Sequence, residues 1–246
     1  MLSYQHIYHA GNLADVHKHM ALSVVLERLM TANKPLTYIE THAGRGLYDL
    51  SSKEAQKTKE AELGIKSLMP KMPKTHAFAK VQDATKKKYG KNFYAGSPYI
   101  ARSILAKSQL HLFELHPQEF VALSQNISGV NLHNKNGYDG TLKLCPPKER
   151  RGLVLIDPSY EIKTEYEDAT KFVFDLHKKW KEAVILLWYP ILDAGHHAPM
   201  VESLEGCWMQ EIMFKDTARI RGSGLIGVNL RAETVKELEK IPAVFE

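Results

Sequence analysis

The sequence predicts an α/β protein built on a mostly parallel sheet. Short apolar runs, of which residues 152–156 are the clearest, alternate with segments whose apolar residues recur at helical spacing. Glycine or carboxylate residues follow several of these runs, as is typical of parallel sheets that bind a ligand at their carboxyl edge. The last two apolar runs look like a hairpin, which adds antiparallel strands at the end of the chain.

The first predicted helix covers residues 12–31, because Asn12 is a good N-cap and apolar residues recur along one face of the segment. Pro35 marks its end. A short buried strand follows at residues 36–41, and the glycine-containing turn 42–46 comes directly after it.

The later elements alternate in the same way. Caps and helical periodicity predict helices over residues 97–107 (capped by Ser97), 117–125, 139–144, 164–181 and 199–205. Apolar runs predict strands at residues 110–115, 129–133, 152–156, 183–188, 209–214 and 224–230. Together with residues 36–41, these runs predict a seven-stranded sheet.

Residues 51–92 break this alternation and carry the charge excess. They hold eleven lysines against four acids, a net charge of +7, whereas the whole chain carries +5 and the remainder therefore −2. We predict a lysine-rich, mostly helical insertion here, between the two parts of a main domain at residues 1–50 and 93–246. Such a basic segment favours an anionic partner, although a merely solvated helix face would give the same composition.

Composition excludes several classes of protein. With 246 residues, 44% hydrophobic and 25% charged, the chain can bury a proper core. The longest apolar run, residues 183–192, is too short to span a membrane, and the first nine residues contain no apolar signal core, so we expect a cytoplasmic protein without a membrane partner. The two cysteines, Cys145 and Cys207, form no disulfide or zinc-binding pattern.

The turn 40–46 and Glu114 together predict a nucleotide-like ligand. Gly44 and Gly46 let the chain turn tightly after a strand, although the motif is incomplete and a plain turn is equally compatible. Glu114 ends the next strand of the main domain, where an acid usually accepts hydrogen bonds from ribose hydroxyls; a surface acid is the alternative. When the insertion is left out of the count, the number of residues between the glycine turn and Glu114 approaches the spacing usual for such a site.

Asp139-Gly140 follows the third strand. A carboxylate at this place could accept a hydrogen bond from an adenine amino group, and an ordinary Asp-Gly turn or helix cap explains it equally well.

The sharpest motif is Asp157-Pro158-Ser159-Tyr160, directly after the buried strand 152–156. The carboxylate of Asp157 and the carbonyl of Pro158 are two acceptors, and Tyr160 offers a flat face. An exocyclic amine on a flipped base needs this combination.

Four histidines lie near the N-terminus, and we predict no metal site from them. His17 and His19 are two residues apart and do not share a helix face, and no metal-binding motif accompanies them or His6 and His9.

These motifs together resemble the class I S-adenosylmethionine-dependent methyltransferases, and within them the bacterial 23S rRNA adenine-N6 methyltransferase family RlmJ. The resemblance covers nearly the whole chain. Its most specific segments are residues 1–4, 9–12, 14–16, 18–19, 41–44, 96–98, 114–117, 157–158, 160–161 and 187–190.

The resemblance implies roles for individual residues. His19, His42, Gly44, Ser97, Glu114, Asp139, Gly140 and Asp157 would surround S-adenosylmethionine, without a metal. Asp157, Pro158 and Tyr160 would position the target adenine, nucleotide 2030 of 23S rRNA in the family. Tyr4 would contact the RNA, and we expect Lys86, Lys87 and Lys88 to meet its phosphates. The chain would act as a monomer.

One residue departs from the family pattern, which has proline where this sequence has Ser159. Serine restores a backbone N–H and some flexibility, so the loop should be less rigid. A DNA adenine-N6 methyltransferase, a non-catalytic RNA-binding protein and a dinucleotide-dependent oxidoreductase remain as alternatives, the last opposed by the missing third glycine.

Overall fold

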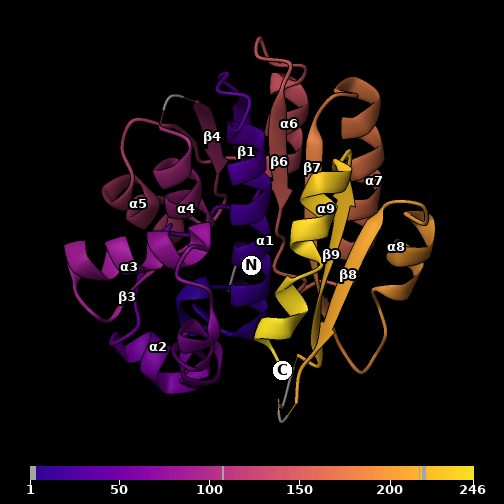
Figure 1. The fold of residues 1–246 in the computed structure, drawn as a ribbon. Helices are drawn as coiled ribbons and strands as arrows, with labels where there is room; N and C mark the ends of the chain where they lie inside the picture. Colours follow the sequence, from indigo (N-terminus) through magenta and orange to yellow (C-terminus); the bar gives the residue numbers. More distant parts are fainter. Residues whose placement is uncertain (1–3, 107, 216, 218–219) are drawn as a thin grey trace.

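A seven-stranded sheet forms the centre of the molecule, with the strand order β5-β4-β1-β6-β7-β9-β8 (Figure 1). The computed structural model describes residues 4–106, 108–215, 217 and 220–246. The sheet consists of β1 (Thr37–Glu40), β4 (Gln109–Phe113), β5 (Asn131–His133), β6 (Gly152–Ile156), β7 (Val184–Ile191), β8 (Trp208–Met213) and β9 (Gly222–Val228). All neighbours pair in parallel except β9, which is antiparallel to both β7 and β8. The predicted fold class is confirmed.

Helices cover both faces of the sheet. They are α1 (Leu13–Met30), α4 (Ser97–Ile104), α5 (Pro117–Asn126), α6 (Gly137–Leu144), α7 (Glu165–Lys179), α8 (Ala198–Ser203) and α9 (Ala232–Leu238). The chain leaves β1 towards β4 and leaves β6 in the opposite direction towards β7, so right-handed crossovers place α4 and α7 on opposite faces. Helix α1 packs beside α4 and α9, whereas α7 packs against α6 and α8.

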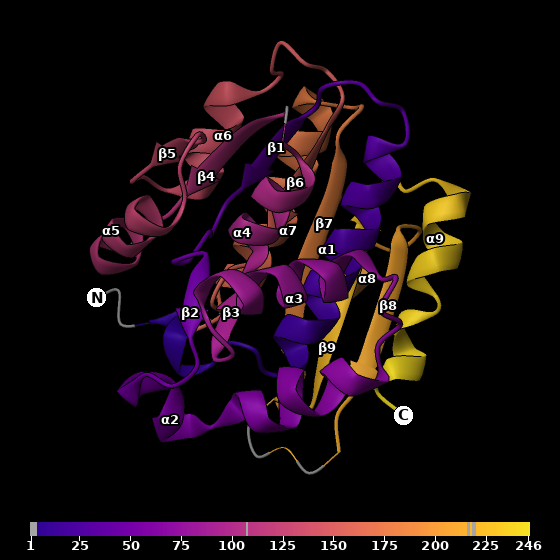
Figure 2. The ribbon, with the colours of Figure 1, turned by 60° about the vertical axis from the view of Figure 1, so that its left-hand side comes forward.

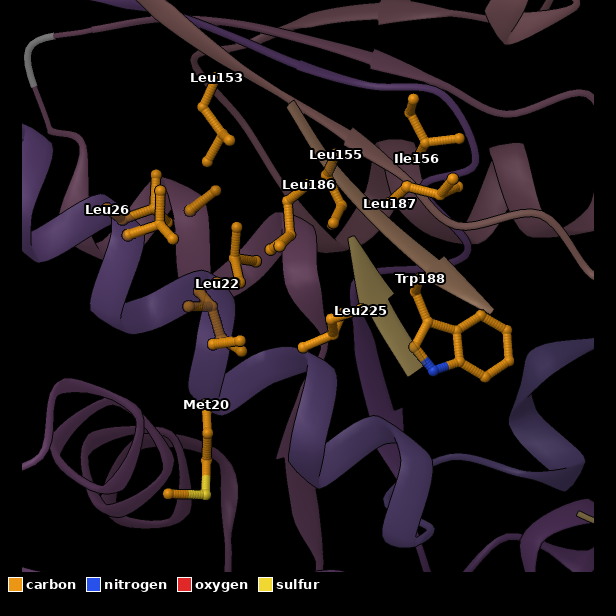
Figure 3. Close-up of a cluster of buried hydrophobic side chains, with 14 of the residues drawn as sticks. Met20, Leu22, Leu26, Leu153, Leu155, Ile156, Leu186, Leu187, Trp188 and Leu225 are labelled. Carbon is orange, nitrogen blue, oxygen red and sulfur yellow. The ribbon is translucent and has the colours of Figure 1, made fainter. Parts of the chain in front are cut away.

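Helix α1 is buried on all sides. Its residues 14–26 are all buried, and Leu22 and Leu26 point towards side chains of β6, β7 and β9, whereas Met20 points away from them (Figure 3). The predicted N-cap is confirmed, because the Asn12 side chain accepts a hydrogen bond from the backbone N–H of Asp15 at 2.8 Å. A helix in this position must supply a partner for every polar side chain that it buries.

Residues 51–92 contain α2 (Lys53–Thr58), a kinked turn (Glu62–Lys66), a short 3-10 turn (Met69–Lys71) and α3 (Ala77–Tyr89). A two-stranded antiparallel sheet, β2 (Leu47–Asp49) with β3 (Phe93–Ala95), joins both ends of this insertion. Helix α3 packs on α1, and the backbone N–H of Ile65 donates to the carbonyl of Gly11 at 2.8 Å (Figure 2). The insertion therefore packs against α1 and the segment that precedes it.

Two expectations about local structure were wrong or incomplete. Gly96, not Ser97, is the N-cap of α4, and the Ser97 hydroxyl donates to the buried carboxylate of Glu40 instead. The sequence analysis also missed β2, β3 and α9, because strands of three residues and a helix of seven are too short for periodicity to show. Across the described residues, no helix has the length and apolar character needed to cross a membrane.

Substituting Gly140 tests how closely α6 approaches the sheet. A Cβ at this position would lie 2.1 Å from the Phe113 ring, so Gly140→Ala should lower the free energy of unfolding by about 1–3 kcal/mol. Alanine favours a helix over glycine by about 1 kcal/mol, so without the clash the variant would gain stability. Urea unfolding measures whether the substitution lowers or raises the free energy of unfolding. A variant more stable than the wild type would contradict this packing.

Candidate active site

A cavity of about 940 Å³ opens where β1, β4, β6 and β7 end. Most of the predicted site residues line it: Tyr4, His19, His42, Gly44, Ser97, Glu114, Asp139, Asp157, Pro158 and Tyr160. Gly140 does not line the cavity and packs against Phe113 instead. Lys86, Lys87 and Lys88 lie near the C-terminal end of α3, also outside its lining.

Glu114 and the glycine turn form one side of the cavity. The Glu114 carboxylate accepts hydrogen bonds from the backbone N–H groups of Gly44 at 2.7 Å and His116 at 2.8 Å. Burial raises the pKa of Glu114, and these two N–H groups oppose the rise. A carboxylate has about four acceptor positions, so two remain for hydroxyl groups of a ligand.

On the same side of the cavity, two glycines allow the backbone to lie very close to neighbouring groups. Gly44 has a φ of +60°, and a Cβ there would lie 2.5 Å from the Tyr48 hydroxyl. A Cβ at Gly137, where α6 begins, would lie 1.9 Å from the carbonyl oxygen of Thr41. Asp139 lies exposed in the first turn of α6, whose cap is Asn136, so the cap interpretation of Asp139 was wrong.

Two histidines and Ser97 line the cavity, and each makes a hydrogen bond to a neighbouring side chain. His19 pairs with the Tyr94 hydroxyl at 2.6 Å, and His42 pairs with the Thr41 hydroxyl at 2.8 Å. Burial lowers the pKa of His19 to about 3 and that of His42 to about 4, so both are neutral at pH 7. Ser97 donates to Glu40, whose pKa burial raises to about 8.

The carboxylate of Asp157 is paired with a buried lysine of α1. The Lys18 ammonium lies 2.5 Å from Asp157 Oδ2 and 3.1 Å from Asp15 Oδ1, and it also lies 5.1 Å from the centre of the Trp188 ring. Asp15 in turn pairs with His6 at 2.8 Å. These four side chains form a continuous charge network, in which Asp15 and Lys18 are buried and the two ends are partly buried: His6, Asp15, Lys18 and Asp157.

Burial and the neighbouring charges shift the pKa of each member of the network. Burial alone would lower the pKa of Lys18, but the two carboxylates outweigh it and raise that pKa, so Lys18 stays charged. Burial would raise the pKa of Asp15, but His6 and Lys18 hold it well below its usual range. Burial raises the pKa of Asp157, and Lys18 opposes the rise.

Tyr160 is held in an unusual backbone conformation. Its φ is +53°, which is strained for a bulky residue, and its hydroxyl donates to the carbonyl of Trp188 at 2.8 Å. The Tyr166 ring packs on it, with 4.3 Å between ring centroids. Only 8% of Tyr160 is exposed, and it lines the cavity.

Ser159 is tied to the next helix. Its hydroxyl approaches both carboxylate oxygens of Glu165, at 3.3 and 3.4 Å, and Glu165 also accepts from the backbone N–H of Ile162. These contacts oppose the flexibility that the serine was expected to introduce.

The N-terminal segment forms a further part of the cavity wall. The Tyr4 hydroxyl lies 2.7 Å from His6 Nδ1, and the Tyr4 ring stacks on His9, which pairs with Glu60 of the insertion at 2.7 Å. His17 points elsewhere, to Ser223 and Gln210. In the part of the chain that the structure describes, no three His, Cys, Asp or Glu side chains form a group that could hold a metal.

Sequence reasoning missed Lys18, Asp15, His6 and Glu40 as members of the site. The available signal was position: Asp15 and Lys18 share one face of a helix whose other residues pack in the core. Only the fold shows that this face meets the end of β6.

The strand order and the cavity at the carboxyl edge are those of class I S-adenosylmethionine-dependent methyltransferases. The family model described as ribosomal RNA large subunit methyltransferase D, RlmJ, matches residues 33–241, and the chain belongs to this family. The resemblance read from the sequence is confirmed.

Similar proteins cover most of the chain. Two are called ribosomal RNA large subunit methyltransferase J: that of Haemophilus influenzae is 36% identical and that of Escherichia coli 34%, each match covering 93% of this chain and 87% of the relative. A crystal structure of a Legionella pneumophila protein, 30% identical, superimposes with a TM-score of 0.84 over 96% of this chain and 94% of that one.

Replacing Lys18 tests the network. Lys18→Met leaves two buried carboxylates without their cation and should lower the free energy of unfolding by about 3–5 kcal/mol at pH 8. The loss should be smaller at pH 5, because an unpaired buried carboxylate takes up a proton as the pH falls.

In the wild-type protein, Asp15 determines the direction in which this network's contribution to stability changes with pH. The lowered pKa of Asp15 gives stability that is present above about pH 4 and lost only as the pH falls through that lowered pKa. Urea unfolding of both proteins at pH 5 and 8 measures the difference. An equal loss at both pH values would show that the two carboxylates do not depend on Lys18.

Proposed function

We propose that the protein transfers a methyl group from S-adenosylmethionine to the N6 amine of an adenine in 23S rRNA. The observation that carries this proposal is Asp157-Pro158 at the end of β6, in the same cavity as Glu114 and Tyr160. Membership of the RlmJ family and the names of the two relatives support a ribosomal RNA substrate. The family's adenine 2030 is the nucleotide that we propose as target.

The residues present fit the cofactor. Glu114 would accept hydrogen bonds from ribose hydroxyls, and Asp139, which lines the cavity, would accept one from the adenine amine. The absence of a side chain at Gly44 and Gly137 allows the backbone to lie close to its neighbours beside the cavity. His19, His42 and Ser97 would line the rest of the cofactor site. When bound, S-adenosylmethionine supplies an electrophilic methyl group, and no metal takes part in this proposal.

Asp157 and Pro158 would prepare the amine for reaction. The lone pair of N6 is delocalised into the adenine ring, so the amine is a poor nucleophile. Hydrogen bonds from N6 to the Asp157 carboxylate and the Pro158 carbonyl favour a pyramidal nitrogen with its lone pair directed at the methyl group. Lys18 holds one oxygen of Asp157, which fixes the direction of the other.

Tyr160 would stack on the target base, since Tyr166 and the bond to Trp188 fix its ring beside Asp157. An unpaired adenine reaches such a pocket more easily, because extrusion from a duplex costs a few kcal/mol. Tyr4 would contact the RNA from the N-terminal side. We propose a monomeric, cytoplasmic enzyme.

A methyl-transfer assay with labelled S-adenosylmethionine tests the proposal. Protein-free 23S rRNA and DNA are offered side by side, and nucleoside analysis identifies the product. N6-methyladenosine in the RNA is expected. Product in DNA alone would favour the DNA methyltransferase, and no product with either substrate would favour a non-catalytic RNA-binding protein.

Asp157→Asn should lose about 10²–10³ in methylation rate, because the amide loses the charge and presents a donor where N6 needs an acceptor. Affinity for S-adenosylhomocysteine should stay within a few-fold, measured by thermal shift. Asp193→Asn, at an exposed carboxylate paired with Arg221, is the matched control and should keep full activity. Near wild-type turnover of Asp157→Asn would remove this carboxylate from the mechanism.

The three lysines at the end of α3 are predicted to meet phosphates. Changing Lys86, Lys87 and Lys88 to Ala should weaken RNA binding and flatten the slope of log K against log salt by about 0.7–0.9 for each phosphate that the variant no longer neutralises. The control removes three exposed lysines elsewhere: Lys178, Lys181 and Lys236. Equal slopes in both triple variants would assign Lys86–Lys88 to an ordinary solvated surface.

A further inference from the structure

Three aromatic side chains gather where the insertion returns to the main domain. Tyr89 ends α3, Phe93 begins β3 and Tyr99 lies in α4, and these three residues are called here the aromatic platform. The Tyr89 ring centroid lies 5.8 Å from that of Phe93 and 5.9 Å from that of Tyr99. The Tyr99 hydroxyl donates to that of Tyr89 at 3.3 Å. Figure 2 shows α3, β3 and α4 side by side.

The platform lies at the edge of the core, against which Tyr99 packs. All three side chains are partly exposed, whereas Phe78, Val81 and Thr85 of the same helix are buried and already anchor α3. Partly exposed rings in a cluster are typical of surfaces that receive another flat group.

Lysines surround these rings. Lys87, Lys88 and Lys91 are exposed, Lys86 is half-buried, and the Lys88 ammonium lies 4.8 Å from the centre of the Tyr89 ring. Basic residues interleaved with aromatic rings bind single-stranded nucleic acid, because phosphates meet the cations while bases stack on the rings.

The platform is close to the cavity along the chain. Gly96 and Ser97 line the cavity, and Phe93 is three residues before Gly96, about 10 Å at the rise of a strand. Tyr94 points to His19 beside the cavity, so Phe93 points to the opposite face of the small sheet. A nucleotide on the platform would therefore lie outside the catalytic cavity.

We propose that Tyr89, Phe93 and Tyr99 form a second nucleotide site, which stacks an unpaired base of the RNA substrate. This inference rests on the proposed function, since it names a further contact of the same RNA. The rings supply attraction that does not depend on salt, and the neighbouring lysines supply the salt-dependent part. The site accepts any base, because every base has a flat face.

Substitution separates the rings from the lysines. The double variant Tyr89→Leu with Tyr99→Leu keeps apolar side chains and should weaken RNA binding about 5- to 100-fold with an unchanged salt slope. The matched control, Tyr89→Phe, keeps the ring and should bind within about twofold of the wild type. Circular dichroism and S-adenosylhomocysteine binding check the fold of each protein.

Each outcome decides between the two proposals. A wild type that neither binds nor methylates 23S rRNA would overturn the proposed function. A wild type that does both, with a correctly folded Leu double variant of equal RNA affinity, would overturn the aromatic platform alone. A flattened salt slope in the Leu variant would also overturn it, because the effect would then come from displaced lysines.

A second measurement uses the unaltered protein. RNA substituted with 5-iodouridine at unpaired positions is irradiated with the wild type, and the crosslinked peptide is sequenced. We expect a crosslink within residues 89–99. Crosslinks confined to other segments would contradict the platform even if the Leu variant does not fold.

Discussion

The ammonium group of Lys18 lies between two buried carboxylates, and the geometry of the site depends on this arrangement. One of them, Asp157, directly follows β6, and the other, Asp15, belongs to α1. A buried ion pair gives little net stability, but removal of one member leaves an uncompensated charge, so the pair strongly selects one position of the helix against the strand. Asp15 extends the network to His6 and thereby fixes the N-terminal segment over the cavity.

The insertion is tied to the same helix. Ile65 donates to the carbonyl of Gly11, just before α1 begins, and Glu60 accepts hydrogen bonds from the side chains of His9 and Asn12. Asn12 is also the N-cap, so one residue joins the insertion, the start of α1 and the cavity wall. A ligand that displaces the N-terminal segment must break these contacts as well as the pair of His6 with Asp15.

Sequence reasoning succeeded where the signal is local. The run at residues 152–156 is β6 without a shift in its bounds, and Asn12 caps α1 as predicted. It failed where the partner is distant in sequence. Nothing near Ser97 reveals that its hydroxyl would bind Glu40, 57 residues earlier, instead of capping α4. The close packing of Gly140 on the Phe113 ring could not be predicted either, because only the strand order brings the two residues near each other. The role of Lys18 depends on Asp157, which lies 139 residues further along the chain.

The charges around the cavity are unevenly distributed, and we expect this to affect how RNA binds. Glu161, Glu165, Asp168 and Asp175 line the cavity beside and along α7, where Lys171 is the single lysine among the described lining residues of that helix. The insertion on the other side carries a net charge of +7. In the complex that we propose with RNA, the first side would repel phosphates and the second would attract them, so a strand with its adenine beside Asp157 would have its flanking nucleotides towards the insertion. The acidic side of α7 would then add specificity, because it would oppose every orientation in which the RNA backbone crosses α7.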